Sequence, residues 1–233
     1  MNNAKDIAAA AGKAIVKDLA KCLPLAGTAI EIYEEFQAKQ IERKIKRLEE
    51  FYANLAKSIN VIEDKINKDY ISKDDFLDVF EESTRYVVLE RQEYKRKLFK
   101  NILVNSITSP KCDYDKTEHY FKLLDNLSVI ELEVLAVLDN PKNYNKSHEM
   151  IIADPINSPY QTSWVYASSM GVLTKLLGLK VHEIEEAITV LFSNGLVIEN
   201  AMSKKIQTNG NTIGVLENLL TTRGRDFVNF LKG

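Results

Sequence analysis

The chain has 233 residues, of which 45% are hydrophobic and 27% are charged, a balance typical of a globular protein with one or two domains. A formal net charge of −2 excludes the overall basic field with which many proteins attract nucleic acid or anionic lipid. Cys22 and Cys112 lie far apart and form no metal-binding pair, and so few cysteines fit a reducing cytoplasm. Lys13 and Lys17 interrupt the apolar runs near the start, so we expect no secretory signal there and a cytoplasmic location.

Residues 4–23 predict a helix rich in small side chains, which Pro24 and Gly27 end. The alanines at 8–11 allow another helix to approach closely. We expect this first helix to pack against the helices that follow it. The alternative is a segment that contacts a membrane or a partner protein.

A heptad seam follows the first helix. Its apolar side chains are separated by alternating steps of four and three residues: Ile41, Ile45, Leu48, Tyr52, Leu55, Ile59, Ile62 and Ile66. This is the 3.5-residue period of a coiled coil. A helix over residues 41–66 would be about 38 Å long at ~1.5 Å per residue, and it must bury the seam against another helix.

A third helix is predicted from Ser72, a capping residue with Asp75 three positions later, to Ile107. One face of it is apolar: Phe76, Phe80, Val87, Tyr94, Leu98 and Ile102. Two long helices joined by a short link at 67–71 predict an antiparallel hairpin, against which the first helix packs. We therefore assign residues 1–112 to a helical hairpin, or coiled-coil, domain.

This hairpin is not expected to cover its own seam completely. Ser83 and Glu90 fall where heptad spacing calls for apolar residues. The apolar surface left over could be buried by a second copy, and a symmetric dimer is the commonest solution to such a stripe. We therefore expect a homodimer formed through the helical half.

The third predicted helix also carries the strongest basic cluster of the chain. Its candidate interaction patch consists of Arg91, Lys95, Arg96 and Lys100, which would contact nucleic acid, lipid headgroups or an acidic partner. The alternative, which we favour, is a solvated face whose charges pair with carboxylates of the neighbouring helix: Glu34, Glu49 and Glu50.

Residues 113–233 are predicted to form a second, winged-helix-like domain. The expected elements are helices at 117–124, 129–138, 165–177 and 181–193, a loop at 142–162, a strand at 196–198, a polar wing at 200–211 with an Asn209-Gly210 turn, a strand at 213–220 and a helix at 222–231. Gly178 and Gly195 stand just past the ends of two of these helices. The fold expected for the whole chain is therefore mainly α.

Three landmarks of this half carry a family resemblance. They are the helix entry at 127–135, the Asn194-Gly195-Leu196-Val197 segment, and the closing run from Leu220 to Phe227 with the pattern L-T-x-x-G-x-x-F. Behind a helical first half, they resemble proteins of the abortive-infection alpha type. That resemblance implies a role in bacterial defence against phage, and it transfers no functional residue.

The sequence offers no catalytic, cofactor-binding or metal-binding constellation. His182 begins a pattern like that of a zinc-protease helix, but Glu186 stands where the second histidine ligand belongs. His148 lies in a predicted polar loop, Cys112 has no basic partner, and the glycines lack the spacing of a phosphate-binding loop. We therefore expect a protein that is not an enzyme and has no cofactor.

Charge argues against the DNA-binding role that a winged helix suggests. Residues 113–233 contain 11 Lys and Arg against 15 Asp and Glu. The presumed recognition helix at 180–194 is acidic, and phosphates would repel it, since phosphate neutralisation supplies much of the affinity for DNA. The candidate wing contacts are only Lys204 and Lys205.

We therefore expect a non-catalytic interaction protein of the bacterial cytoplasm that acts through helix–helix and winged-helix contacts with an unidentified protein partner. The first alternative is a DNA-binding transcriptional regulator. The second is an effector that associates with a membrane through the first helix.

Overall fold

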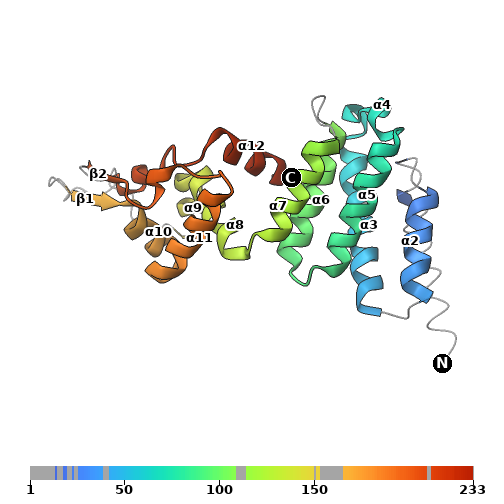
Figure 1. Cartoon of the computed structure of the whole chain (residues 1–233), viewed down its shortest axis with the longest axis horizontal. Coiled ribbons are helices and arrows are strands. Elements are labelled where there is room, and N and C mark those ends of the chain that lie inside the picture. The colour runs from blue at the N-terminus through green and yellow to red at the C-terminus, as the bar shows by residue number, and fades with distance from the viewer. Residues whose placement is uncertain are drawn as a thin grey trace. The chain divides into compact units, whose positions relative to one another are not determined.

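The computed structural model describes residues 14, 18–19, 23, 26–38, 42–108, 114–149, 151–152, 165–208 and 211–232. The chain divides into one unit made of Met1–Asn126 with Phe230–Gly233, and a second made of Leu127–Asn229. Both are mainly helical, as predicted, and the second also contains a small antiparallel sheet (Figure 1). The first predicted helix, at 4–23, falls largely outside the described residues. None of the described helices is both long and apolar enough to span a bilayer.

The helical unit is built around two central helices, α5 and α6. Its described elements are α2 (Ala26–Ala38), α3 (Glu42–Val61), the 3₁₀ helix η1 (Glu63–Lys65), α4 (Lys68–Ile71), α5 (Asp74–Leu89), α6 (Glu93–Thr108) and α7 (Tyr114–Asn126). Helices α5 and α6 pack against each other, and both are contacted by α3 and by α7 (Figure 1).

The middle of the heptad seam is buried within a single chain, whereas Ile45, Ile62 and Ile66 are only half-buried. Leu48, Tyr52 and Leu55 are fully buried in α3, and Ile59 is 1% exposed. The ring of Tyr52 stacks on that of Phe80 of α5 at 5.7 Å between centroids. The prediction that the seam faces other helices is therefore confirmed, and the covering helices belong to the same chain.

The helix that carries the seam ends at Val61, earlier than the end that the sequence predicts near Asn67 and Lys68. The chain turns after this helix, and Asn67 fixes the turn through two hydrogen bonds. Its side chain accepts a hydrogen bond from the Tyr70 N–H at 3.1 Å, which caps α4. Its backbone N–H donates to the carbonyl of Ile107 at 3.0 Å, so the turn is fixed to the end of α6.

The predicted third helix is wrong as a continuous element, because it breaks into α5 and α6 at Glu90. Glu90 has an extended backbone with ψ of 127°, and its carboxylate accepts from the Gln92 N–H at 2.7 Å. Arg47 of α3 donates to the Val88 carbonyl at 2.9 Å, and Arg96 donates to the Arg91 carbonyl at 2.9 Å. These bonds replace the helical ones that the break removes, so three helices stand in place of the predicted two-helix hairpin.

The division between the units follows α7 and therefore lies later than the boundary expected between residues 112 and 113. Helix α7 belongs with the first unit because its Phe121 enters the aromatic cluster of α5 and α6. The Phe121 ring lies 6.0 Å from that of Phe99 and 6.2 Å from that of Tyr86, and the last two are stacked at 5.1 Å.

The second unit is a set of short helices beside a two-stranded sheet. Its described elements are α8 (Val129–Asp139), α9 (Pro141–Ser147), β1 (Val165–Ser168), α10 (Ser169–Leu177), α11 (Val181–Ser193), η3 (Glu199–Ala201), β2 (Lys205–Thr208), η4 (Thr212–Leu216) and α12 (Thr222–Leu231), whose last residues belong to the first unit. The Ser128–Glu131 capping box is present, and Gly178 ends α10 at a φ of 66°, as its position predicts.

The sheet forms from segments other than those predicted. Strand β1, from the start of a predicted helix, pairs antiparallel with β2, from the predicted wing, in a register that runs from Val165↔Thr208 to Ser168↔Lys205. The two predicted strands meet only in a single bridge between Val197 and Leu220. Residues 212–216 form a 3₁₀ helix, and the Asn209-Gly210 turn lies outside the described residues.

Part of the predicted loop at 142–162 is the helix α9. Asn140 caps this helix, because its side chain accepts from the Asn143 N–H at 3.1 Å, and Pro141 stands at the first helical position. A proline at that position has no N–H to satisfy and a φ that already suits a helix. The Asn140-Pro141 pair therefore separates α8 from α9 and begins the second of them.

The L-T-x-x-G motif has a structural explanation. The Thr221 hydroxyl donates to the Gly195 carbonyl at 2.7 Å and accepts from the Gly224 N–H at 2.9 Å. The Thr221 N–H donates to the Leu196 carbonyl at 3.0 Å. A Cβ at Gly224 would lie 2.0 Å from that same carbonyl oxygen. The motif therefore fixes the first turn of α12 against the turn that follows α11.

We predict that Leu55→Asp lowers the free energy of unfolding by about 4 kcal/mol, because it places an unpaired carboxylate in the buried seam. The matched control is Val61→Asp, which changes the same kind of side chain at an 86% exposed site of the same helix. It should cost less than about 1 kcal/mol, as expected for a carboxylate near a helix C-terminus. Thermal melts followed by circular dichroism compare the two, and equal melting temperatures would contradict the buried seam.

We also predict that Gly224→Ala destabilises the second unit by about 2 kcal/mol, because the added methyl group forces α12 away from the Leu196 carbonyl. Gly27→Ala in α2 is the control, since its Cβ would meet nothing within 4 Å and alanine favours a helix. Scanning calorimetry should show a lower transition for Gly224→Ala alone. An unchanged thermogram would mean that the close approach at Gly224 is not required.

Candidate functional site

The four residues of the candidate interaction patch do not share one free surface. Lys95 is 6% exposed, and its ammonium group lies 3.4 Å from the Glu90 carboxylate and donates to the Asp125 carbonyl at 2.9 Å. Arg91 is the exposed member of the set. Lys95 therefore joins α6 to α7 inside the helical unit.

The other two members, Arg96 and Lys100, both face α3. Arg96 lies 3.8 Å from the Glu50 carboxylate, and Lys100 donates to the Ser58 hydroxyl at 2.9 Å. Pairing with α3 was the alternative that the sequence favoured, and Glu50 is one of the carboxylates named for it. Glu49 instead accepts from the Tyr33 hydroxyl at 2.9 Å.

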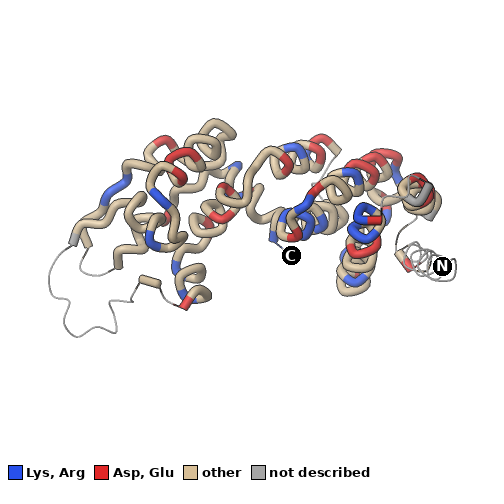
Figure 2. The backbone as a smooth tube through the Cα atoms, turned by 90° about the horizontal axis from the view of Figure 1, so that it is seen from below, with Lys and Arg blue, Asp and Glu red and all other residues tan. Residues whose placement is uncertain are grey.

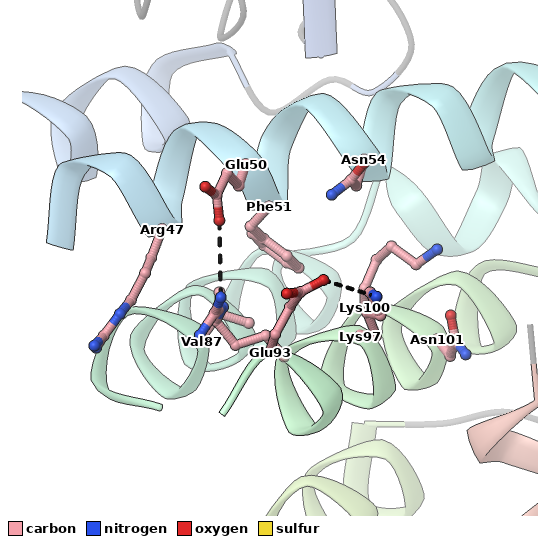
Figure 3. A pocket seen from close by; sticks show the side chains of 10 residues that line it. Arg47, Glu50, Phe51, Asn54, Val87, Glu93, Lys97, Lys100 and Asn101 are labelled. Atoms are coloured by element: carbon pink, nitrogen blue, oxygen red, sulfur yellow. Dashed lines mark ion pairs between the residues drawn. The ribbon is translucent and has the colours of Figure 1, made fainter. Parts of the chain in front are cut away.

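Arg96 and Lys100 line a hollow of about 530 Å³, which we call the basic groove. It lies beside α3 and α6 within the helical unit (Figure 3). Its lining consists of Arg47, Glu50, Phe51, Asn54, Val87, Glu93, Arg96, Lys97, Lys100 and Asn101. A hollow of this size falls in the range of small-molecule sites.

The groove carries four basic side chains against two carboxylates. Figure 3 shows the two ion pairs, in which Lys97 contacts Glu93 at 2.7 Å and Arg96 contacts Glu50 at 3.8 Å. The other two basic side chains are bonded to neutral oxygens: Arg47 to the Val88 and Leu89 carbonyls, and Lys100 to the Ser58 hydroxyl. The lining therefore has an excess of positive charge.

The electrostatics of Lys100 reflect this excess. Partial burial lowers the pKa of the Lys100 ammonium group below its ordinary value, and the positive charge of Lys97 lowers it further. Desolvation and a neighbouring cation both disfavour a charged amine. A negative charge placed in the groove would favour the charged ammonium form and so oppose both effects.

A second candidate surface lies on the exposed side of α11, and we call it the α11 face: Val181, Glu185, Glu186, Thr189, Val190 and Phe192. Phe192 is 47% exposed and Val190 is 36% exposed, although both are large apolar side chains. No Lys or Arg occurs in α11. The helix therefore presents carboxylates and apolar groups to solvent.

The two candidate wing contacts, Lys204 and Lys205, differ in their exposure to solvent. Lys204 is half-buried and donates to the Glu217 carbonyl at 2.6 Å, so it holds two segments of the second unit together. Lys205 is exposed on β2. Basic and acidic residues both occur on the helices of each unit (Figure 2).

The histidines have local roles or face solvent. His148 stacks on Tyr144 at 4.0 Å, and its ring nitrogen lies 2.8 Å from the Tyr144 carbonyl oxygen. His182 is exposed at the start of α11. Within the described residues, no three His, Cys, Asp or Glu side chains gather as a metal site would need. Both cysteines lie outside the described residues.

Comparison with known proteins gives no relative from which to assign the groove or the α11 face. No protein family, curated protein or solved structure matches the chain.

The four lining residues that α3 supplies were not predicted from the sequence as part of a site. Arg47, Glu50, Phe51 and Asn54 recur at steps of three and four residues, which marks one face of a helix. This second stripe was visible in the sequence beside the seam. The element that this stripe contacts depends on the break between α5 and α6, and the sequence did not indicate that break.

We predict that Glu90→Gln lowers the free energy of unfolding by about 2 kcal/mol, because it leaves the buried Lys95 cation without its carboxylate partner. Gln keeps an oxygen that can accept from the Gln92 N–H, so the turn itself is preserved. Arg91→Gln, at the exposed neighbouring position, should change stability by less than about 0.5 kcal/mol. Urea unfolding measures both, and similar values for the two variants would rule out a structural role for the Lys95–Glu90 pair.

Proposed function

We propose that this protein is a non-catalytic interaction protein that binds another protein through the α11 face, while its helical unit supplies helix–helix contacts. The observation that carries the proposal is the exposure of Phe192 and Val190 beside the carboxylates of Glu185 and Glu186. Aromatic side chains are enriched at protein interfaces and often anchor them. The partner would present apolar and basic side chains to this face.

A winged-helix-like architecture for the second unit is part of this proposal. Its support is the order of elements, in which a strand precedes two helices joined by a short turn at Gly178, and a second strand follows them. In that arrangement α11 occupies the place of a recognition helix. The same position serves contact with a protein when the helix is acidic.

DNA binding is the first alternative, and the α11 face argues against it. A helix in the major groove lies close to phosphates, and this one offers them carboxylates and no Lys or Arg. Lys180 precedes the helix, Lys205 lies on β2, and Arg223 and Arg225 are exposed in α12. None of them lies on the α11 face itself, where a phosphate would meet Glu185 and Glu186.

The resemblance to abortive-infection alpha-type proteins supports a bacterial setting and a role in phage defence as part of the same proposal. The second alternative, an effector that associates with membranes, depended on the helix predicted at 4–23. Most of that segment lies outside the described residues, so this alternative stays a prediction.

The homodimer also stays a prediction. The seam that suggested it is covered within one chain, so a second copy is not needed to bury Leu48 or Leu55. What remains in its favour is the exposure of two apolar side chains of the helical unit: Val61 at 86% and Leu89 at 63%. A second copy could cover them.

The α11 face can be tested by placing a photoreactive amino acid at position 190 of the full chain in its host cells. We expect a discrete crosslinked protein adduct that disappears when Phe192→Glu is added, because a carboxylate cannot enter an apolar contact. Tyr166→Glu is the matched control, since Tyr166 is an 81% exposed aromatic residue of the same unit outside this face.

The same chain is tested against random duplex DNA at physiological salt by fluorescence polarisation. The proposal predicts no saturable binding. Saturable duplex binding that Lys180→Glu removes would instead favour the DNA-binding alternative, and an adduct that survives Phe192→Glu would contradict the α11 face.

A further inference from the structure

We propose that the basic groove of the helical unit binds a small soluble phosphate monoester, a role independent of the α11 face. Four basic side chains face the hollow: Arg47, Arg96, Lys97 and Lys100. Glu50 and Glu93 balance two of them, which leaves a formal excess of two positive charges. A phosphate monoester carries a charge near −2 at neutral pH, so its phosphoryl group matches this excess.

The donors left open in the groove also suit a phosphoryl group. An arginine has five N–H donors, and Arg47 uses its Nη1 nitrogen on the Val88 and Leu89 carbonyls. Lys100 has three donors and uses one on the Ser58 hydroxyl. Both side chains are held in place by these bonds, so little freedom is lost on binding. Arg47 and Lys100 extend toward opposite ends of the lining (Figure 3), so the phosphoryl group would lie beside Lys100 and Arg47 would bond a polar group elsewhere on the ligand.

The shape of the groove indicates an organic phosphate rather than the free ion. Its volume of about 530 Å³ exceeds what a single phosphate fills. The ring of Phe51, which is 4% exposed, forms part of its lining, and Val87 lies beneath the surface of the groove with no exposed area. Asn54 and Asn101 also line the groove (Figure 3). The Asn101 side-chain nitrogen already donates to the Leu231 carbonyl, so Asn54 is the amide that can bind polar groups of the rest of the ligand.

The electrostatic environment of Lys100 favours a bound phosphate monoester. Its ammonium group is partly buried near Lys97 and bonded to a neutral hydroxyl, so no carboxylate of the groove offsets its charge directly. A bound phosphoryl group would supply that missing charge. Ion pairing of this kind weakens with added salt, because exposed parts of the groove are screened.

Isothermal titration of the full chain tests the proposal with three probes: inorganic phosphate, adenosine 5′-monophosphate and adenosine. We expect both phosphates to bind, the organic one more tightly, and uncharged adenosine not to bind. Lys100→Gln should weaken phosphate binding about fivefold or more, as expected for a unit charge about 4 Å away in water. Gln can still hydrogen-bond Ser58, which limits any effect on folding.

Glu93→Gln is the decisive second variant, because it removes a carboxylate from the groove at an exposed position. It should strengthen phosphate binding about fivefold, a gain that a merely structural effect would not produce. Lys73→Gln, the same charge change at an exposed site outside the groove, should leave binding unchanged. The proposal is overturned if neither phosphate binds below about 10 mM. It is equally overturned if Lys100→Gln and Glu93→Gln bind phosphate as the unaltered chain does.

Discussion

The helical unit depends on the break between α5 and α6, where the chain leaves the helical conformation at Glu90. Ending one helix and starting another leaves N–H and C=O groups without partners, and burial would make each of them costly. Arg47 and Arg96 bind the freed carbonyls, while Glu90 binds a freed N–H and the Lys95 ammonium group. Because the break is satisfied in this way, two short helices rather than one long helix cover the seam. The same bonds fix two of the basic side chains of the groove.

The sequence predicted those elements whose signals are local and repeated. The seam on α3 and the caps at Ser128 and Gly178 needed only spacing and residue type, and all are present. The break at Glu90 and the pairing of β1 with β2 were missed, because both depend on groups far away in the chain. Glu90 did stand out as a carboxylate in an apolar stripe. The periodicity of the sequence marks Glu90 as irregular. Only contacts made in three dimensions, such as that of Arg47 with the Val88 carbonyl, show that the helix ends there.

The candidate sites show the same limit. Lys95 and Arg96 are adjacent in the sequence, yet one is buried against α7 and the other faces α3. Charge counting placed them in one patch. Adjacent side chains on a helix point about 100° apart, but which of them meets a neighbouring helix depends on how the helices pack. The α11 face was easier to anticipate, because its acidic composition is a local property. Phe192, by contrast, has the spacing of a core residue, and only the structure shows that it is exposed.

The end of α12 bears on the order in which this protein can complete its structure during translation. The side chain of Asn101 binds the Leu231 carbonyl at 2.8 Å, across 130 residues of sequence, and Asn105 binds the carbonyls of Phe230 and Lys232. Every residue of the second unit is translated before these bonds can form. The helical unit can thus emerge early with its aromatic cluster assembled, while one side of α6 stays open to water until the closing segment arrives. Contacts of such long range form late and slowly, which makes that side of α6 the surface most exposed to chaperones during synthesis.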